Sequence, residues 1–463
     1  MYSRDVVLDA LRHAENMGVG LVIVRFHERL LEHVVADGGG LRDYSFSVHS
    51  GVGVEVYSGG GRGFYFTSDL SREGLKAAVE RAYSMARVSR PSFKPSLVDG
   101  WRGSFRSGFR VDPFSVEPKV KVDMVLDVNR ESSSREGVSS AVTRLGFEKD
   151  YRCVVTSEGV EAESLTILSG FSHTVVAKHA GTYERVGDSK SLVGGFETIE
   201  SMDLRAFAEE VDGLALKAVT AKTAPPGSYE AVIDNDIVGV LIHEALGHAS
   251  EGDHVVAGSS VISGKIGESI AGSEVTIVDE GLVEGGYPVY FDDEGVVKRK
   301  TLIVERGVLK SYLTSRAVAP EVGLELTGNG RAQGYSNEPI VRQTNYYIEA
   351  GGWSVEELFE GLNGVYLKGK GMVGGGQVDT SNGVFTFTVG PSYIVKNGEP
   401  LELVRGVAIT GNILELLKNI TGVGRDLKLE TSVFGGCGKG GQMVRVGLGG
   451  PHVRVKRVIV GGT

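Results

Sequence analysis

The residues best suited to chemistry lie in one short segment near the middle of the chain. The run HEALGHASEGD begins at His243 and holds two imidazoles five positions apart, with the carboxylate of Glu244 beside the first. Neutral imidazole is the commonest protein ligand of zinc, and a neighbouring Glu is the usual general base of a zinc hydrolase. His243, His248 and Glu244 are therefore candidates for a hydrolytic metal site. The alternative is a chance string or a buried hydrogen-bond cluster.

The spacing of the two histidines restricts the backbone between them. At about 100° per residue, positions i and i+5 differ by about 140°, so the two rings would not share a face of a regular helix. A π-type turn closes i to i+5, and a helix end at Gly247 would also let the backbone turn. We therefore predict a widened turn or a helix end between His243 and His248. A straight helix with the rings more than about 6 Å apart would exclude this ligand pair.

A short strand and a capped helix are expected to position this segment. Residues 231–234 have the pattern of a strand, and the apolar residues of 235–242 have that of a buried helix. The polar residues 234–236 between them are typical of a helix N-cap. The histidines are therefore expected near the C-terminal end of a helix anchored in the core.

A catalytic zinc site needs a third protein ligand and an open position for water. The sequence offers Glu251, Asp253, His254 and Cys437. The first two are close in sequence to the histidines. Cys437 lies in GGCGKGG, where glycines let the backbone approach a bound ion, and a thiolate is a strong zinc ligand. Because a free cysteine is more often a small buried hydrophobe, the residues alone leave the third ligand open.

Guanidinium and amide donors are concentrated near two later turns. They belong to Arg331, in the segment NGR, and to Arg342 and Asn345, in the segment RQTN. Such groups can hold a substrate carboxylate or carbonyl, or they can form structural forks to buried backbone. We keep both interpretations, with all three residues as candidates for substrate binding.

Composition limits the class of protein. The 463 residues carry a formal net charge of −10, which gives a nucleic-acid role little electrostatic support. The first residues lack the pattern of a signal peptide, and no uncharged apolar run approaches the roughly 18 residues that span a bilayer. Two cysteines, Cys153 and Cys437, exclude a disulfide framework. We therefore expect a cytoplasmic protein that binds neither nucleic acid nor membrane.

Turn-rich segments divide the chain into three expected domains. The boundaries fall after a loop-rich segment at 91–118 and at KTAPPGS, which begins at residue 222. We expect an α+β protein with an N-terminal α/β domain of antiparallel sheet and helices at 1–118 and a middle α+β domain at 119–221. A β-rich domain at 222–463, with a large curved antiparallel sheet, would carry the helix with the two histidines.

A series of motifs along nearly the whole chain resembles the TldD/PmbA (TldE) family. The N-terminal GVGVEVYSGGGRGFYFTSDLS resembles the first domain of that family. The presence of HExxxH and of a late cysteine places the chain on the TldD side, because PmbA/TldE-type partners lack the metal motif. The later motifs are, in order, HEALGHASEGD, FDDEG, LIVERGVLKSYLTSR, TGNGRA, RQTN, GGGQVD, GVAITGN and GGCGKGGQ.

The resemblance implies a function and a ligand set. It implies a zinc metallopeptidase that degrades small or unfolded peptides, with zinc held by His243, His248 and Cys437 and with Glu244 as the base that activates water. It thereby favours the cysteine over the two nearby carboxylates. It also implies a dimer, either a homodimer or a heterodimer with a PmbA/TldE-like paralogue, and a substrate bound by strand addition.

The sequence departs modestly from the family, and two other functions remain open. The family often has RMTN where this chain has Gln343, NGRR where it has Ala332, and a proline near Arg445. None of these departures removes a proposed ligand. The first rival is a catalytically silent peptide-binding or regulatory subunit, which the intact metal motif disfavours. The second is a metal-dependent hydrolase of small amides or esters.

Overall fold

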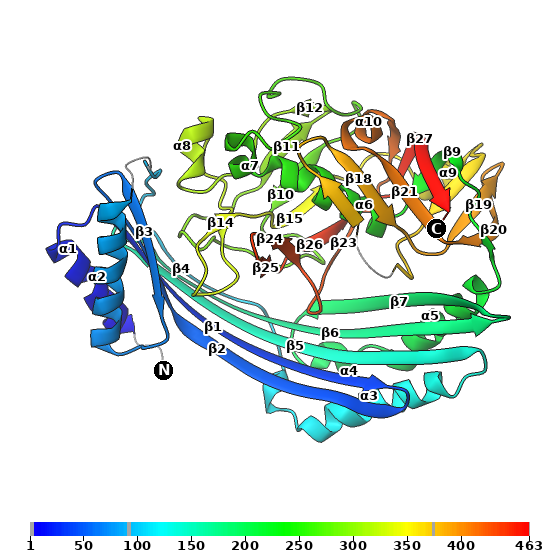
Figure 1. Ribbon diagram of the computed structural model, residues 1–463, viewed down its shortest axis with the longest axis horizontal. Helices are drawn as coiled ribbons and strands as arrows, with labels where there is room; N and C mark the ends of the chain where they lie inside the picture. The colour runs from blue at the N-terminus through cyan, green and yellow to red at the C-terminus, as the bar shows by residue number, and fades with distance from the viewer. Residues whose placement is uncertain (1–3, 90–93, 373–375, 463) are drawn as a thin grey trace.

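The computed structural model describes residues 4–89, 94–372 and 376–462 and has the α+β architecture expected from the sequence. Across these residues a 13-stranded sheet and a 10-stranded sheet form the frame of the molecule (Figure 1). Residues 90–93, at the start of the expected linker, and residues 374–375, in the GGGQVD motif, lie outside the described residues.

The helices are α1 (Arg4–Asn16), α2 (Arg72–Val88), η1 (Pro113–Ser115), α3 (Pro118–Ser133), α4 (Glu197–Glu200), α5 (Leu204–Ala218), α6 (Asn235–Leu241), η2 (Ile242–Gly247), η3 (His248–Ser250), α7 (Gly252–Val256), α8 (Val318–Val322), α9 (Val355–Phe359) and α10 (Ile413–Lys418). The strands of the first half are β1 (Leu21–Asp37), β2 (Gly40–Ser58), β3 (Gly61–Thr67), β4 (Arg102–Arg106), β5 (Val138–Thr156), β6 (Glu161–His179) and β7 (Thr182–Val193). The strands of the second half are β8 (Lys222–Thr223), β9 (Gly227–Ile233), β10 (Ile277–Glu280), β11 (Thr301–Glu305), β12 (Val308–Leu309), β13 (Gly330–Arg331), β14 (Ile340–Val341), β15 (Asn345–Ile348), β16 (Gly364–Leu367), β17 (Gly376–Asp379), β18 (Val384–Thr388), β19 (Ser392–Lys396), β20 (Glu399–Arg405), β21 (Val407–Asn412), β22 (Ile420–Val423), β23 (Lys428–Thr431), β24 (Cys437–Lys439), β25 (Gln442–Val444), β26 (Gly447–Gly450) and β27 (Val453–Gly462).

Long antiparallel strands form the curved lower half of the molecule (Figure 1). Strand β1 runs well beyond the apolar residues 21–24 with which it begins, because both of its edges are paired, to β2 and to β5. Its second half has polar side chains on one face, yet the buried Glu32 is balanced by Lys121 of α3 at 2.5 Å. Since strand pairing satisfies the backbone and the ion pair satisfies the carboxylate, the polar residues do not end the strand.

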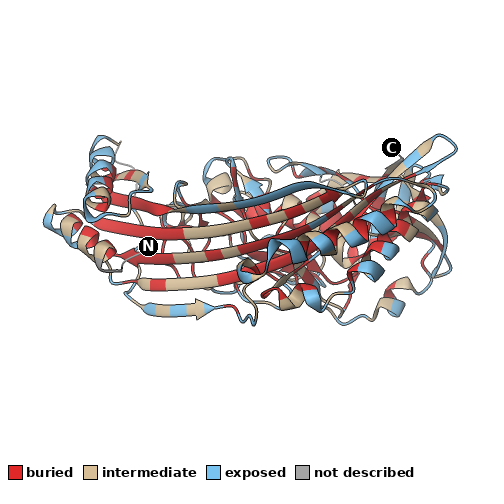
Figure 2. Cartoon of the chain, turned by 90° about the horizontal axis from the view of Figure 1, so that it is seen from below, coloured by how far each residue is buried: buried red, intermediate tan, exposed pale blue. Residues whose placement is uncertain are grey.

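Helices cover one face of the long strands in two groups. Near one end α1 and α2 pack against apolar residues of β1 and β2, with Leu75 and Val79 of α2 buried. Farther along, α3 and α5 lie on the same sheet, and Val125 of α3 packs with Phe147 and Phe171 (Figure 2). Apolar residues at helical spacing in 71–85 and 204–221 predict helices there, and α2 and α5 form in these segments with buried residues on that face.

The large sheet spans all three expected domains. Strand β1 pairs with β5 over its length, from Ile23↔Thr156 to Asp37↔Val142, and β7 touches β23 at Ser191↔Thr431. Part of the expected linker is itself a strand, because β4 pairs in parallel with β6. A division at 118 and 221 remains our proposal for how the chain is organised.

The C-terminal part contributes shorter strands to both sheets, and these sheets are mixed. Antiparallel β9, β21 and β27 form the middle of the 10-stranded sheet, whereas the pairs β9–β16 and β8–β20 are parallel. The expected antiparallel sheet is therefore present with parallel pairs added to it. The largest apolar cluster lies here and includes Ile237, Leu241, Ile242 and Leu246. The helix that carries the histidines is thus anchored in the core, as predicted.

None of the helices in the described ranges is both long and apolar enough to span a membrane.

Candidate metal centre

The two histidines lie on a widened helical turn. Asp234 is the N-cap of helix α6, and its carboxylate accepts the N–H of Ile237 at 3.1 Å. The following η2 is a π-turn, and the N–H of His248 donates to the carbonyl of His243. The ring centroids of His243 and His248 are 5.3 Å apart, with the planes at 80°. The widened turn predicted from the five-residue spacing is confirmed, and it puts both imidazoles on one side of the helix.

Gly247 and Gln343 pack together against this turn. The amide Nε2 of Gln343 donates to the carbonyl of His243 at 3.1 Å, and the side chain is fully buried. A Cβ atom on Gly247 would lie 1.9 Å from Oε1 of Gln343, so only glycine leaves room for this amide. The sequence showed Gln343 only as a departure from a family motif, and its contact with the π-turn was not foreseen.

Cys437 completes a three-residue cluster with the histidines. It begins β24, and its Sγ lies 3.6 Å from Nε2 of His248, although 189 residues separate the two in sequence. One donor atom from each of His243, His248 and Cys437 lies within 4.8 Å of the others, and all three residues are buried. We call this group the thiolate cluster.

The donor atoms of the thiolate cluster fit a zinc ion. Both ring nitrogens of His243 are buried and have no hydrogen-bond partner among the described residues. Burial by itself raises the pKa of the Cys437 thiol, but the adjacent His243 and His248 lower it to about 5. Two imidazoles and a thiolate are a known zinc donor set, and buried polar atoms normally have partners. An ion at this position would supply the partners that the imidazole of His243 lacks.

Glu251 orients His248 from the opposite side of the ring. Its fully buried carboxylate lies 2.9 Å from Nδ1 of His248, which leaves Nε2 directed to Cys437. Burial tends to raise the pKa of Glu251, yet His248 and then Lys439 lower it to about 2. Burial tends to lower the pKa of His248, yet Glu251 and the thiol raise it to about 11 in the absence of metal. A carboxylate behind a ligating histidine is the usual support of a metal site.

The other acidic candidates for a third ligand belong to a separate group. Glu251, Asp253 and His254 also place donor atoms within 4.8 Å of one another. The ammonium of Lys439 lies 2.9 Å from Glu251 and 2.7 Å from both carboxylate oxygens of Asp253. We call these four residues the lysine cluster. The ammonium takes the place that a cation would occupy, and the sequence analysis had not singled out Lys439.

Glu244 lies beside the thiolate cluster and is open to solvent. Its Oε2 is 3.7 Å from Nε2 of His248, and its side chain is 41% exposed. The neighbouring donor atoms are almost completely buried. A carboxylate that is both accessible and next to the donors has the position that a base acting on water requires.

The expected substrate-binding donors are directed to the backbone. Arg342 is fully buried and donates to the carbonyl of Cys437, and Arg331 donates to the carbonyl of Gln343. The amide of Asn345 donates to three carbonyls at 2.7–3.2 Å. These contacts match the structural forks that were the alternative interpretation, and they hold the segments that carry the site.

Comparison with known proteins identifies the class to which this fold and this centre belong. Family models for three successive metallopeptidase domains match almost the whole chain. The chain belongs to the PmbA/TldD family and lies on its TldD side, as its motifs predict. The matched models are PmbA/TldA metallopeptidase domain 1 at residues 22–86, the central domain at 111–220 and the C-terminal domain at 226–462.

Individual relatives share most of their length with this chain. A protein of Methanothermobacter thermautotrophicus named "Metalloprotease" is 37% identical over 93% of each chain. A "Zinc metalloprotease TldD homolog" of Saccharolobus solfataricus is 28% identical and covers 98% of this chain and 99% of its own. The crystal structure of TldE from Thermococcus kodakarensis has a TM-score of 0.80 at 18% identity, with 99% and 100% coverage, and shows the same fold.

Proposed function

We propose that this protein is a zinc-dependent metallopeptidase that hydrolyses small or unfolded peptides. The convergence of His243, His248 and Cys437 beside the accessible Glu244 carries this proposal. The names of the relatives add support, since they are metalloproteases and one is named a zinc metalloprotease. A silent peptide-binding subunit would have no need of a buried donor set with unpaired imidazole nitrogens.

The residues of the chain divide the chemistry between them. Bound zinc would supply Lewis acidity toward a water molecule and toward the peptide carbonyl. Glu244 takes a proton from the attacking water and returns it to the departing amine. Glu251 keeps the Nδ1–H of His248 bonded, so that Nε2 stays directed at the ion. The carbonyl of Cys437 accepts from Arg342, which fixes the strand that carries the thiolate.

An exposed strand edge next to the centre supports a peptide as substrate. Strand β17 is the edge of the 10-stranded sheet and packs against the π-turn η2. Its residues are mostly exposed, and it pairs with β18 on its other side. An extended peptide can add to such an edge through main-chain hydrogen bonds, which tolerate varied side chains. Small or unfolded peptides meet this requirement, whereas folded proteins do not.

A second exposed edge supports a dimer. Residues 40–51 of β2 pair with β1 and have no further strand on their outer side in the described part of the chain (Figure 2). Leu41, Phe46 and Val48 on this edge are each about half exposed. Long apolar edges are normally covered. We propose that a second copy or a PmbA/TldE-like paralogue covers this one, and that the assembly works in the cytoplasm.

Replacement of Glu244 by glutamine tests the proposed function. The variant Glu244→Gln removes the base and leaves the three ligands in place, so we expect wild-type zinc content and a fall in peptide hydrolysis of at least about a hundredfold. Full hydrolysis by this variant would overturn the role of Glu244. Hydrolysis of small amide or ester substrates, without cleavage of any peptide in a mixed library, would favour the hydrolase alternative.

A further inference from the structure

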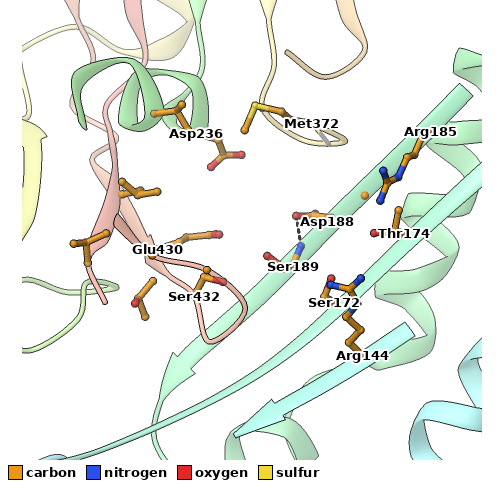
Figure 3. Close-up of a pocket in the computed structure, with 18 residues that line it drawn as sticks. Arg144, Ser172, Thr174, Arg185, Asp188, Ser189, Asp236, Met372, Glu430 and Ser432 are labelled. Atoms are coloured by element: carbon orange, nitrogen blue, oxygen red, sulfur yellow. Dashed lines mark hydrogen bonds between the residues drawn. The ribbon is translucent and has the colours of Figure 1, made fainter. Parts of the chain in front are cut away.

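The large sheet opens into a cavity between β7 and β23. These neighbouring strands touch at Ser191↔Thr431 and then diverge, and a cavity of about 420 Å³ occupies the space between them (Figure 3). Its lining includes Gly187 and Ser189 of β7, Glu430 of β23 and parts of β5 and β6. The cavity therefore lies between two neighbouring strands of one sheet, with β7 on one side and β23 on the other.

The β7 side of this gap has the form of an open strand edge. Strand β7 pairs with β6 along its whole length, whereas its only described partner on the other side is Thr431. Arg185 and residues 187–189 of this edge line the cavity, and the N–H of Ser189 donates to the carboxylate of Asp188 at 2.8 Å, which an added strand would displace. An extended segment of chain placed there would continue the sheet, because strand addition needs only free N–H and C=O groups.

The cavity also borders the segments that carry the thiolate cluster. Gly436, which precedes the ligand Cys437, lines one end. Val240 lines the same region and lies one helical turn before Glu244, on the same side of the helix. A chain that occupies the gap therefore lies next to the segments that carry the residues assigned to catalysis.

Two guanidinium groups on the sheet face the cavity without an acidic partner. Arg144 of β5 and Arg185 of β7 both line it and are exposed, and no ion pair or hydrogen bond involves either side chain among the described residues. Ser172 and Thr174 of β6 lie between them on the lining (Figure 3). Two unpaired guanidinium groups with hydroxyl groups between them are suited to a carboxylate.

Three acidic residues also line the cavity, Asp188 on β7 and Asp236 and Glu430 on the other side, and each has a lysine nearby. The ammonium of Lys428 is 2.7 Å from Glu430 and 3.8 Å from Asp236, and that of Lys370 is 3.9 Å from Asp188. Lys370 lies closer to Glu210, at 2.5 Å, so it balances Asp188 only in part. The lining carboxylates thus share two lysines, whereas Arg144 and Arg185 have no charged partner among the described residues.

We propose that the gap between β7 and β23 binds an extended segment of the substrate, and that Arg144 and Arg185 bind a carboxylate on that segment. This inference rests on the proposed function for the nature of the ligand, a peptide. The protein then prefers peptides with an acidic side chain or a free C-terminal carboxylate at the position that reaches the two arginines. This selectivity is superimposed on the sequence-tolerant binding of the main chain.

Four versions of one fluorescent peptide test this inference. They carry Glu or Gln at a scanned position and a free or an amidated C-terminus, and binding is measured with Glu244→Gln protein, both zinc-loaded and as purified without added metal. We expect one carboxylate to tighten binding about tenfold. The double variant Arg144→Gln/Arg185→Gln should lose this preference. The double variant Lys178→Gln/Lys190→Gln, an equal change of charge at exposed side chains of β6 and β7 outside the cavity lining, should retain it.

The arms of the experiment separate the possible results. Loss of the preference on Glu→Gln assigns the carboxylate to a side chain, and loss on amidation assigns it to the C-terminus. Equal affinity for all four peptides, or an unchanged preference in the double arginine variant with wild-type melting temperature, would overturn the inference. If wild-type protein cleaves none of the peptides but the arginine-dependent preference persists, the proposed catalysis fails while carboxylate binding stands.

Discussion

The thiolate cluster and the lysine cluster lie on opposite sides of the His248 ring. They differ in how many of their metal-ligating atoms already have a partner in the protein. Both groups place three potential ligand atoms within 4.8 Å of one another. In the lysine cluster the ammonium of Lys439 binds both carboxylates, at 2.7–2.9 Å. In the thiolate cluster both ring nitrogens of His243 are buried without a described partner. Proximity of ligand atoms is thus common to both, but only the thiolate cluster has a side chain whose ligand atoms all lack partners, since in the lysine cluster Oε1 of Glu251 is unpaired while its Oε2 is bound.

The position of one cation, the Lys439 ammonium, explains why these neighbouring residues differ in the partners they have. Lys439 follows Cys437 by two residues, so β24 delivers the thiolate to one cluster and the ammonium to the other. Glu251 lies between them, bound to Lys439 and to Nδ1 of His248. The lysine cluster is therefore the support of the metal centre and not a second centre.

Removal of one histidine from each cluster should give the largest contrast. His243→Ala deletes a ligand, so we expect loss of bound zinc and a fall in kcat/KM of at least about a thousandfold, or about 4 kcal/mol. His254→Ala alters the lysine cluster alone and should change both quantities less than about threefold. Metal analysis and peptide kinetics on the two variants check this. Equal losses in both would remove the distinction between the clusters.

Removal of the Lys439 ammonium should show how much this charge stabilises the buried carboxylate of Glu251. Lys439→Met leaves Glu251, which is fully buried, with His248 as its main remaining partner. Removal of one partner of a buried charge is strongly destabilising, but protonated His248 still balances Glu251 in part, so we expect the free energy of unfolding of the metal-free protein to fall by about 2 kcal/mol. Denaturant unfolding measures this. A decrease below about 1 kcal/mol would show that Lys439 does not balance Glu251.

The π-turn that joins the two histidines should be sensitive to added volume. Gly247→Ala brings a Cβ within 1.9 Å of Oε1 of Gln343, whose buried side chain has little room to move. We expect a loss of about 2 kcal/mol in unfolding free energy and weaker zinc binding. The double variant Gly247→Ala/Gln343→Ala should restore part of both. A Gly247→Ala protein with unchanged stability and zinc affinity would mean that this contact does not hold the turn.

The pH dependence of zinc binding should report on Glu251. The pKa of His248, about 11 without metal, means that the ring is protonated at neutral pH and must lose that proton to bind zinc. Because of this proton, the affinity for zinc should rise by about tenfold per pH unit below the pKa of His248. The rise should stop once the pH exceeds that pKa. In Glu251→Gln the pKa of His248 falls, because its largest raising influence is gone, and proton release near pH 8 should shrink. Calorimetry in buffers of different ionisation enthalpy measures it, and identical release in both proteins would contradict this role of Glu251.

Local features of the fold and the site were predictable from the sequence because they depend on neighbours in the chain. The five-residue spacing of His243 and His248 predicts a widened turn, since a regular helix cannot bring both rings together, and the π-turn confirms it. Helices α2 and α5 follow from their periodicity and caps. These predictions need only backbone geometry and a buried face.

Features that depend on distant contacts were not predictable in the same way. The thiol of Cys437 meets a ring 189 residues away, so the residues alone could not separate it from the nearby carboxylates. The role of Lys439 and the approach of Gln343 to His243 likewise need the tertiary fold. Strand pairing shows the same limit, because the single sheet that joins β1 to β5 and β7 to β23 crosses every expected boundary.

The most direct test of the metal centre is the zinc content of protein purified without chelators. Mass spectrometry of the wild type and of Cys437→Ala gives the number of ions per chain. We expect about one zinc per chain in the wild type and its loss in the variant, since two imidazoles alone hold zinc weakly. Retention of zinc by Cys437→Ala would contradict this ligand set and return the third ligand to the acidic residues beside His248.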